Sequence, residues 1–178
     1  MKNLILSLSF LLCMYLSGRA QTGDSTVILH HEVGINTSTI SGIGVFYSYN
    51  LGNQLSIKAV GMVYNEMKNN SQSRSDFFSI LGLEIQHNLT YSQASRLYAF
   101  AGASYWYNQY TIDSDITTNK TVNIGTGLGF EFRIWEHLCL NMNFGFQQVR
   151  ESRNPSFESY IPYTRIGMGG GASIGYQF

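Results

Sequence analysis

Side chains along residues 121–134 alternate between two series with a period of two. This period is the repeat of an extended strand, in which successive side chains point to opposite faces, whereas a helix repeats every 3.6 residues. One face of the strand is therefore expected to be apolar, and the other to carry small or polar groups. The apolar series is Val122, Ile124, Thr126, Leu128, Phe130, Phe132 and Ile134, and the other series is Asn123, Gly125, Gly127, Gly129, Glu131 and Arg133.

Seven further stretches show the same alternation, of which the first is the least regular. Eight such strands joined in sequence by turns predict an all-β fold, an eight-stranded antiparallel up-and-down β-barrel. An even number of antiparallel strands can also close on itself and leave no backbone edge unpaired. The seven stretches are residues 27–36, 42–49, 55–64, 77–86, 97–108, 138–147 and 165–178.

The low charge content indicates which medium the apolar face meets. Charged residues make up 12% of the chain, against about 25% in ordinary soluble domains. A soluble lipocalin-type barrel, the alternative fold, places its apolar side inward and its charges outward. Here the bulky series suits a band in contact with lipid, and the Gly- and Asn-rich series suits a crowded interior. The sequence therefore predicts a transmembrane barrel.

The links between the predicted strands alternate in length. The links near 51–53, 90–95 and 135–137 are short, while those at 65–75, 109–120 and 150–161 are long and polar. Outer-membrane barrels have short periplasmic turns and longer outer loops, so we expect periplasmic termini. The long links are then expected to carry the charges of the cell-surface side, namely Lys68, Arg74, Asp113, Asp115, Lys120, Arg150, Glu151 and Arg153.

The N-terminus has the features of an export signal. Lys2 precedes an apolar run, and Gly18 and Ala20 have the spacing that a signal peptidase recognises, which predicts a signal peptide over residues 1–20 and a barrel domain over 21–178. Without Lys2 and Arg19, nine basic residues face eleven acidic ones, a balance that argues against a nucleic-acid partner. Cys139 is then the only cysteine, which excludes an intramolecular disulfide, and we expect no metal site and no cofactor.

The end of the chain resembles a known sorting signal. Ile174, Tyr176 and Phe178 form an alternating apolar series that ends in a terminal aromatic residue. This series is similar to the signal by which the barrel-assembly machinery recognises its substrates, and the chain as a whole resembles the small eight-stranded OmpA/OmpX-type outer-membrane barrels. The resemblance implies a Gram-negative outer membrane, contact with its lipid and lipopolysaccharide, and a monomer.

Six charged residues fall on the interior face by parity. Because a buried charge is costly unless it is paired, the equal numbers of acids and bases predict an interior ion-pair network. Lys58 and Glu84 are expected to lie at similar depth on neighbouring strands and to pair. An eight-stranded barrel has room inside only for side chains, so an open pore is not expected. The six residues are Glu32, Lys58, Glu84, Glu131, Arg133 and Arg165.

Three functions are compatible with this sequence. We expect a non-enzymatic protein whose outer loops provide contact or adhesion, with no catalytic residue. One alternative is a narrow transporter for small hydrophobic solutes that leave through the barrel wall. Another is a lipid A-modifying barrel enzyme, of which the deacylases place a His and a Ser two residues apart. His31 is followed by Val33 and His87 by Leu89, so neither position fits that pattern.

Overall fold

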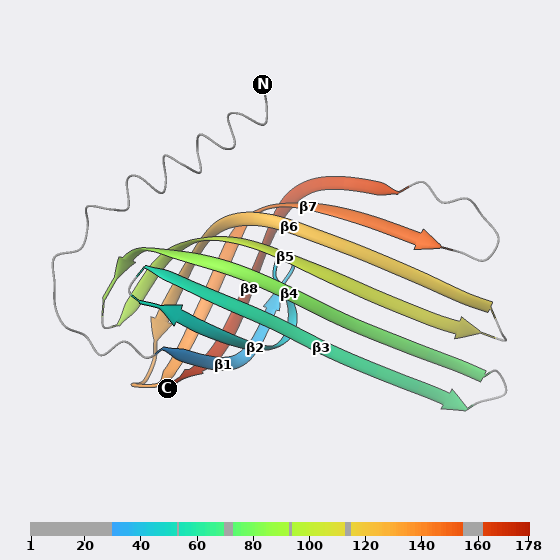
Figure 1. Ribbon diagram of the computed structural model, residues 1–178, viewed down its shortest axis with the longest axis horizontal. Helices are drawn as coiled ribbons and strands as arrows, with labels where there is room; N and C mark the ends of the chain where they lie inside the picture. The colour runs from blue at the N-terminus through green and yellow to red at the C-terminus, as the bar shows by residue number, and fades with distance from the viewer. Residues whose placement is uncertain (1–29, 53, 70–72, 93, 113–114, 155–161) are drawn as a thin grey trace, which may run out of the picture.

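The computed structural model describes residues 30–52, 54–69, 73–92, 94–112, 115–154 and 162–178, so the predicted signal peptide lies outside the described residues. Each strand pairs antiparallel with the next, and the first pairs with the last, giving a closed barrel (Figure 1). The predicted fold is confirmed, while the side of the membrane on which the termini lie stays a prediction. The strands are β1 (His31–Ser38), β2 (Gly42–Leu51), β3 (Leu55–Asn69), β4 (Ser73–Tyr91), β5 (Ser95–Ile112), β6 (Asp115–Arg133), β7 (Leu138–Asn154) and β8 (Tyr163–Gln177).

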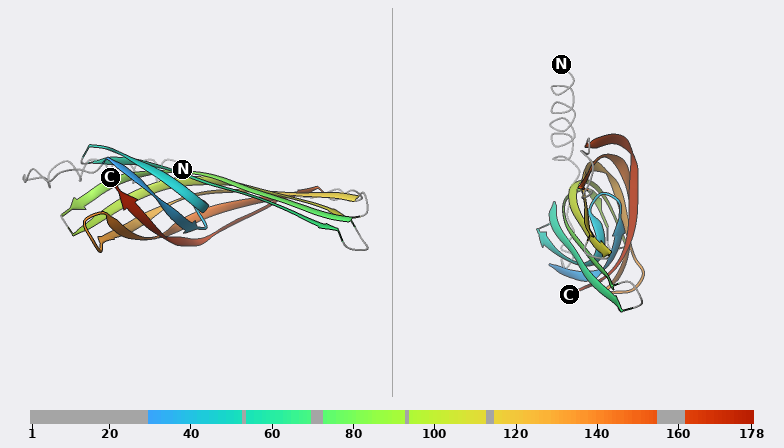
Figure 2. Two further views of the ribbon diagram at one scale, coloured as in Figure 1. Left: turned by 90° about the horizontal axis from the view of Figure 1, so that it is seen from below. Right: turned by 90° about the vertical axis from the view of Figure 1, so that its right-hand side faces the viewer.

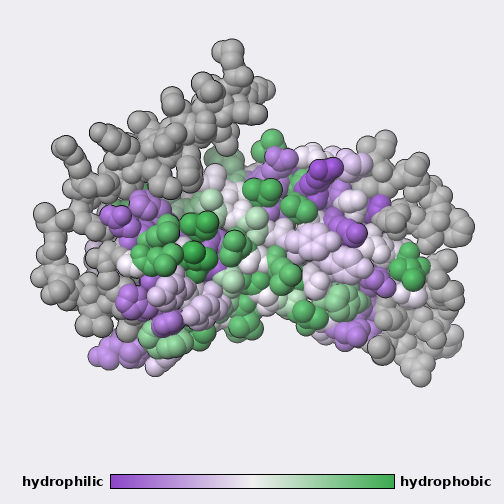
Figure 3. Space-filling model, viewed as in Figure 1, coloured by the Kyte–Doolittle hydropathy of each residue, from purple (hydrophilic) through white to green (hydrophobic). Residues whose placement is uncertain are grey.

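The bulky apolar series points outward, as the alternation predicts. Leu128 is 40% exposed and Phe146 is 67% exposed, whereas the inward-facing Asn123 and Asn143 are buried. In the space-filling view the apolar residues gather over the middle of the visible face (Figure 3). Among the described residues, no helix has the length and apolar character needed to cross a membrane.

The strands differ in length, and this difference shapes the molecule. β1 has 8 residues and β2 has 10, whereas β4 and β6 each have 19. The wall closes only as far as the pairs Ser38 with Gly171 and Val45 with Gly61. Beyond them β3–β8 continue as an open sheet, the projecting sheet (Figure 2). Much of the predicted links at 65–75 and 109–120 is therefore strand, and the charged residues Lys120, Arg150, Glu151 and Arg153 lie on β6 and β7.

The turn between β1 and β2, residues 39–41, folds into the barrel and is called the tip. Ile40 and Ser41 are completely buried, and a Cβ atom at Gly125 would lie 3.0 Å from Ile40 Cγ2. Ser38 Oγ accepts hydrogen bonds from the backbone N–H groups of Ile40 and Ser41, at 3.2 and 3.3 Å. Gly42 follows with a φ of 95°, a conformation that side chains disfavour. The tip thus fills the interior where the closed wall ends.

Spin labels at Leu128 and Asn143 test which face meets the acyl chains. We expect a label at Leu128 to be accessible to dissolved oxygen in lipid bilayers, because this side chain points outward. A label at Asn143, which is 7% exposed and points inward, should be shielded from oxygen. The accessibilities come from power-saturation electron paramagnetic resonance. Greater oxygen access at 143 than at 128 would contradict the assignment of the two faces.

Candidate functional site

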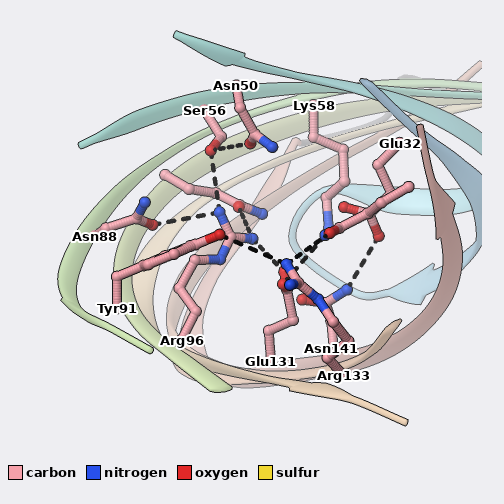
Figure 4. Close-up of polar contacts among 12 residues, drawn as sticks. Glu32, Asn50, Ser56, Lys58, Asn88, Tyr91, Arg96, Glu131, Arg133 and Asn141 are labelled. Atoms are coloured by element: carbon pink, nitrogen blue, oxygen red, sulfur yellow. Dashed lines mark hydrogen bonds and ion pairs between the residues drawn. The ribbon is translucent and has the colours of Figure 1, made fainter. Parts of the chain in front are cut away.

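A charged network fills the barrel between the tip and the end that carries the chain termini. Five ionisable side chains from five strands point into this space, and each is at most 5% exposed. Figure 4 shows four of them, Glu32, Lys58, Arg96 and Glu131, directed toward one another across the interior. They are Glu32 on β1, Lys58 on β3, Glu84 on β4, Arg96 on β5 and Glu131 on β6.

Lys58 and Glu84 lie directly opposite each other on β3 and β4. Lys58 Nζ is 3.3 Å from Glu84 Oε1 and donates a second hydrogen bond of 3.3 Å to Asn36 Oδ1. Gln86 Nε2 donates to Glu84 Oε1 at 2.7 Å, and the ammonium group lies 5.3 Å from the centre of the Phe46 ring. The register of two adjacent strands therefore brings this expected pair together.

Arg96 is the centre of the second half of the network. Its Nη2 lies 2.5 Å from Glu131 Oε2 and donates to Gln86 Oε1 at 2.9 Å. Its Nη1 donates to Ser56 Oγ at 3.0 Å and to Asn88 Oδ1 at 3.3 Å. The planar guanidinium thus joins side chains of β3, β4 and β6, a role suited to its fixed fork of donors.

Sequence reasoning did not identify Arg96 as an interior residue. The sequence predicts a link at 90–95 and a strand that begins at Leu97, whereas β5 begins at Ser95. Tyr98 and Phe100 share the inward face, and stepping back two positions from Tyr98 reaches Arg96. The alternation therefore indicates that Arg96 points inward, but the strand predicted to begin at Leu97 does not include it.

The remaining inward residues connect β1 with β6, β7 and β8. Asn141 Nδ2 donates to Glu32 Oε1 at 3.3 Å, and Gln177 Nε2 donates to Glu131 Oε1 at 3.2 Å. Arg133 lies half-buried at the same end of the barrel, where its Nη2 donates to Gln177 Oε1 at 3.1 Å. The network therefore extends from the middle of the barrel to the end that carries the termini.

The expectation that Arg165 belongs to the interior network is wrong. Arg165 lies opposite the inward-facing Val149, but its side chain is 57% exposed and pairs instead with Glu151 at 3.5 Å. The reason is that β1 ends at Ser38, whose partner on β8 is Gly171. Arg165 lies beyond that point, on the projecting sheet, where no β1 residue covers it.

The end of the chain completes the closure of the barrel. Phe178 N donates to His31 O at 2.9 Å, and His31 N donates to Phe178 O at 3.1 Å. The ring of His31 stacks on that of Phe178 at 5.5 Å, and its Nδ1 lies 2.6 Å from Tyr47 Oη. The side chains of Ile174, Tyr176 and Phe178 are exposed on the outward face; their recognition as a sorting signal stays a prediction.

The network leaves little free space. A cavity with a volume of about 10 Å³ lies beside Arg96 and Glu131, lined also by Asn50, Asn88 and Gln177, and it has room for about one water molecule. Among the described residues, no group of three or more His, Cys, Asp or Glu side chains could hold a metal ion. The geometry is that of two ion pairs, Lys58–Glu84 and Arg96–Glu131, together with Glu32 and Arg133, which are held by hydrogen bonds to neutral side chains.

Replacing Lys58 tests whether the network stabilises the barrel. We expect Lys58→Met to lower the free energy of unfolding by about 3–5 kcal/mol, because it leaves the buried Glu84 without its cation. Adding Glu84→Gln should recover most of this loss. Urea unfolding in lipid vesicles measures both changes. Glu151→Gln, which breaks the half-exposed pair with Arg165, is the control and should cost less than about 1 kcal/mol. An equal loss in the control and in Lys58→Met would contradict the assignment.

Three solved structures of known proteins are similar to this barrel. They are Ail, the attachment invasion locus protein of Yersinia pestis, a major outer membrane protein from Thermus thermophilus, and Neisserial surface protein A. Their sequence identities are 11%, 12% and 12%, and their TM-scores 0.46, 0.48 and 0.44. Each match covers 84% of this chain, and 97%, 98% and 95% of the respective structures. No curated protein sequence matches the chain.

The sequence model of the outer membrane protein β-barrel domain matches residues 12–178. This match includes all eight strands and the inward and outward faces described above. The chain therefore belongs to the family of outer membrane protein β-barrel domains and is a protein of the outer membrane.

Proposed function

We propose that the chain is a non-enzymatic outer-membrane protein that acts by contact. In this proposal the closed barrel is the anchor, and the projecting sheet and its hairpin ends face the outside of the cell and meet the partner surface. The observation that carries the proposal is the contrast between a filled barrel and the strands β3–β8 that continue past it (Figure 2).

The inner face of the projecting sheet has the composition of a contact surface. Tyr64 on β3 is 52% exposed and Tyr163 on β8 is 58% exposed. Between them, Phe78 and Trp106 pack edge to face at 6.1 Å. Aromatic side chains are enriched in protein contact surfaces because they provide large, rigid area with a polar group at one end. This face is therefore the part of the molecule best suited to a partner.

The filled interior favours contact over the transport alternative. A solute would have to pass the buried Ile40 of the tip and then cross the pair Arg96–Glu131 and the pair Lys58–Glu84. Opening these pairs would leave charges unpaired at low dielectric, which is strongly unfavourable. A path along the whole length of the barrel would therefore need the network to come apart, and a solute that leaves through the wall would first have to displace the buried Ile40 of the tip.

Shortening the three long hairpins tests the contact function. Residues 65–77, 109–118 and 152–162 are each replaced by Asn-Gly, which favours a tight hairpin turn. In the same variant the aromatic residues of the inner face are changed to Ser, namely Tyr64, Phe78, Trp106 and Tyr163. The new turns join residues that are already opposite each other: Tyr64 with Phe78, Asn108 with Asn119, and Glu151 with Tyr163. We expect the shortened barrel to fold but cells that display it to lose attachment to a second cell layer and to one another, as measured by adhesion counts and sedimentation.

The matched control for this experiment is Lys58→Met with Glu84→Gln in the full-length chain, which changes the interior and leaves the projecting sheet intact. Resistance to detergent before boiling verifies folding of every variant. Full attachment by the shortened barrel, at equal surface amounts, would contradict a contact function.

Recordings across planar bilayers test the filled interior. We expect no stable channels of nanosiemens size and no uptake of hydrophobic solutes into liposomes that contain the protein. Stable channels or solute uptake would move the function to the transport class. A change in lipid A acyl chains, seen by mass spectrometry only in cells that make the protein, would move it to the enzyme class.

A further inference from the structure

Two cations stand out on the outward face of the barrel. Among the described side chains of the eight strands, the charged groups on this face are Lys120 on β6 and Arg150 on β7. Arg150 follows Val149, which points inward and is 4% exposed, and Lys120 is three positions from the inward-facing Asn123. Alternation along each strand therefore turns both cations outward, where both are exposed.

The two cations are close neighbours. Lys120 lies opposite Ser152, and Val122 lies opposite Arg150, so the two residues are diagonal neighbours on adjacent strands, a register that places their backbone positions about 7–8 Å apart. Neither forms an ion pair with another described residue, and the adjacent carboxylate, Glu151, faces inward and pairs with Arg165. Two like charges this close repel each other, so an external anion that contacts both would stabilise the arrangement.

The pair lies at the border of the apolar band. Toward the end with the termini, the outward face carries exposed apolar side chains, while Thr118 and Ser152 follow on the other side. On β5, Tyr107 lies opposite Lys120, and tyrosine is typical of the headgroup layer. The neighbouring apolar residues are Val122 at 37%, Ile124 at 60%, Phe146 at 67% and Ile166 at 78% exposure.

We propose that Lys120 and Arg150 bind a phosphate group of lipid A, with its acyl chains lying on the exposed apolar side chains of β6–β8. Arg presents a fork of donors that matches phosphate geometry, and Lys adds a point charge. A ligand with a phosphate headgroup and hydrocarbon chains fits a cation pair directly above an apolar surface. The site goes beyond the contact function and requires only that the projecting sheet faces the outer leaflet.

A lone cation at a membrane border can instead extend into water at almost no cost. A cation that only extends into water does not need a second cation beside it. Repulsion between two cations would instead favour positions far apart around the barrel. The adjacency of Lys120 and Arg150 is thus the feature that points to a shared anion.

The test measures lipid binding to the folded protein in phosphatidylcholine nanodiscs. Diphosphoryl lipid A, lipid A stripped of both phosphates, and phosphatidylglycerol are added separately, and native mass spectrometry gives apparent dissociation constants. We expect diphosphoryl lipid A to bind most tightly. Lys120→Gln with Arg150→Gln should weaken its binding about thirtyfold, and each single substitution about fivefold. Lys120→Arg with Arg150→Lys should retain binding.

Arg153→Gln with Arg165→Gln removes the same charge from the inward face and is the matched control. The proposal is overturned if this control loses as much affinity as Lys120→Gln with Arg150→Gln. It is also overturned if phosphate-free lipid A or phosphatidylglycerol binds as tightly as diphosphoryl lipid A. If the double variant does not fold, the two single variants decide. Because adhesion is not the readout, loss of the contact function would leave this result unaffected.

Discussion

The backbone hydrogen bonds between β1 and β8 determine how far the wall of this barrel is closed. In hydrocarbon each unsatisfied N–H or C=O costs several kcal/mol, so a sheet can span lipid only where it has no edge. β1 supplies eight residues, which at about 3.3 Å each and a tilt near 40° give a closed height of roughly 20 Å. This height is close to the apolar band of outer-membrane barrels, about 25 Å. The shortest strand therefore sets how far the wall is fully closed. Beyond that point β6 and β7 still have a paired strand on each side as far as Lys120 and Arg150, so their backbone groups stay satisfied there.

The short first hairpin also explains how the interior is filled. Because β1 and β2 end early, their tip bends inward instead of projecting with the other hairpins. Glycines opposite it provide the space: a Cβ atom at Gly82 would clash with Ser41 O, and one at Gly102 would lie 3.4 Å from Ile40 Cγ2. Glycine on an inward face is thus a place for a neighbouring backbone. The tip and the ion pairs together fill the closed section of the barrel, which supports its proposed role as the anchor.

Alternation in the sequence was enough to predict the barrel, its faces and the opposition of Lys58 and Glu84, because a period of two fixes the side of every residue in a strand. It could not predict where a strand ends. The predicted interior lacks Arg96 because β5 begins two residues earlier than expected. It includes Arg165 because alternation gives the side to which a residue points, but not whether another strand covers it. Whether an inward residue is buried depends on how far the neighbouring strand extends. For Arg165 that strand is β1, and the sequence of β8 does not reveal how long β1 is. For the same reason Lys120 and Arg150 were expected in loops, although they lie on β6 and β7.

The two faces of the sheet balance charge by different means, and this difference separates structural from functional charges. Inside the barrel a charge is shielded from bulk water, so a buried cation such as Arg96 is stabilised by an anion of the same chain, Glu131. Such a buried pair contributes to folding and stability. At the border of the apolar band the surroundings can supply the anion, and among the described residues no carboxylate forms an ion pair with Lys120 or Arg150. A cation pair without a carboxylate partner among the described residues is therefore suited to an anion from the surroundings, which is the basis for proposing a phosphorylated lipid as its ligand.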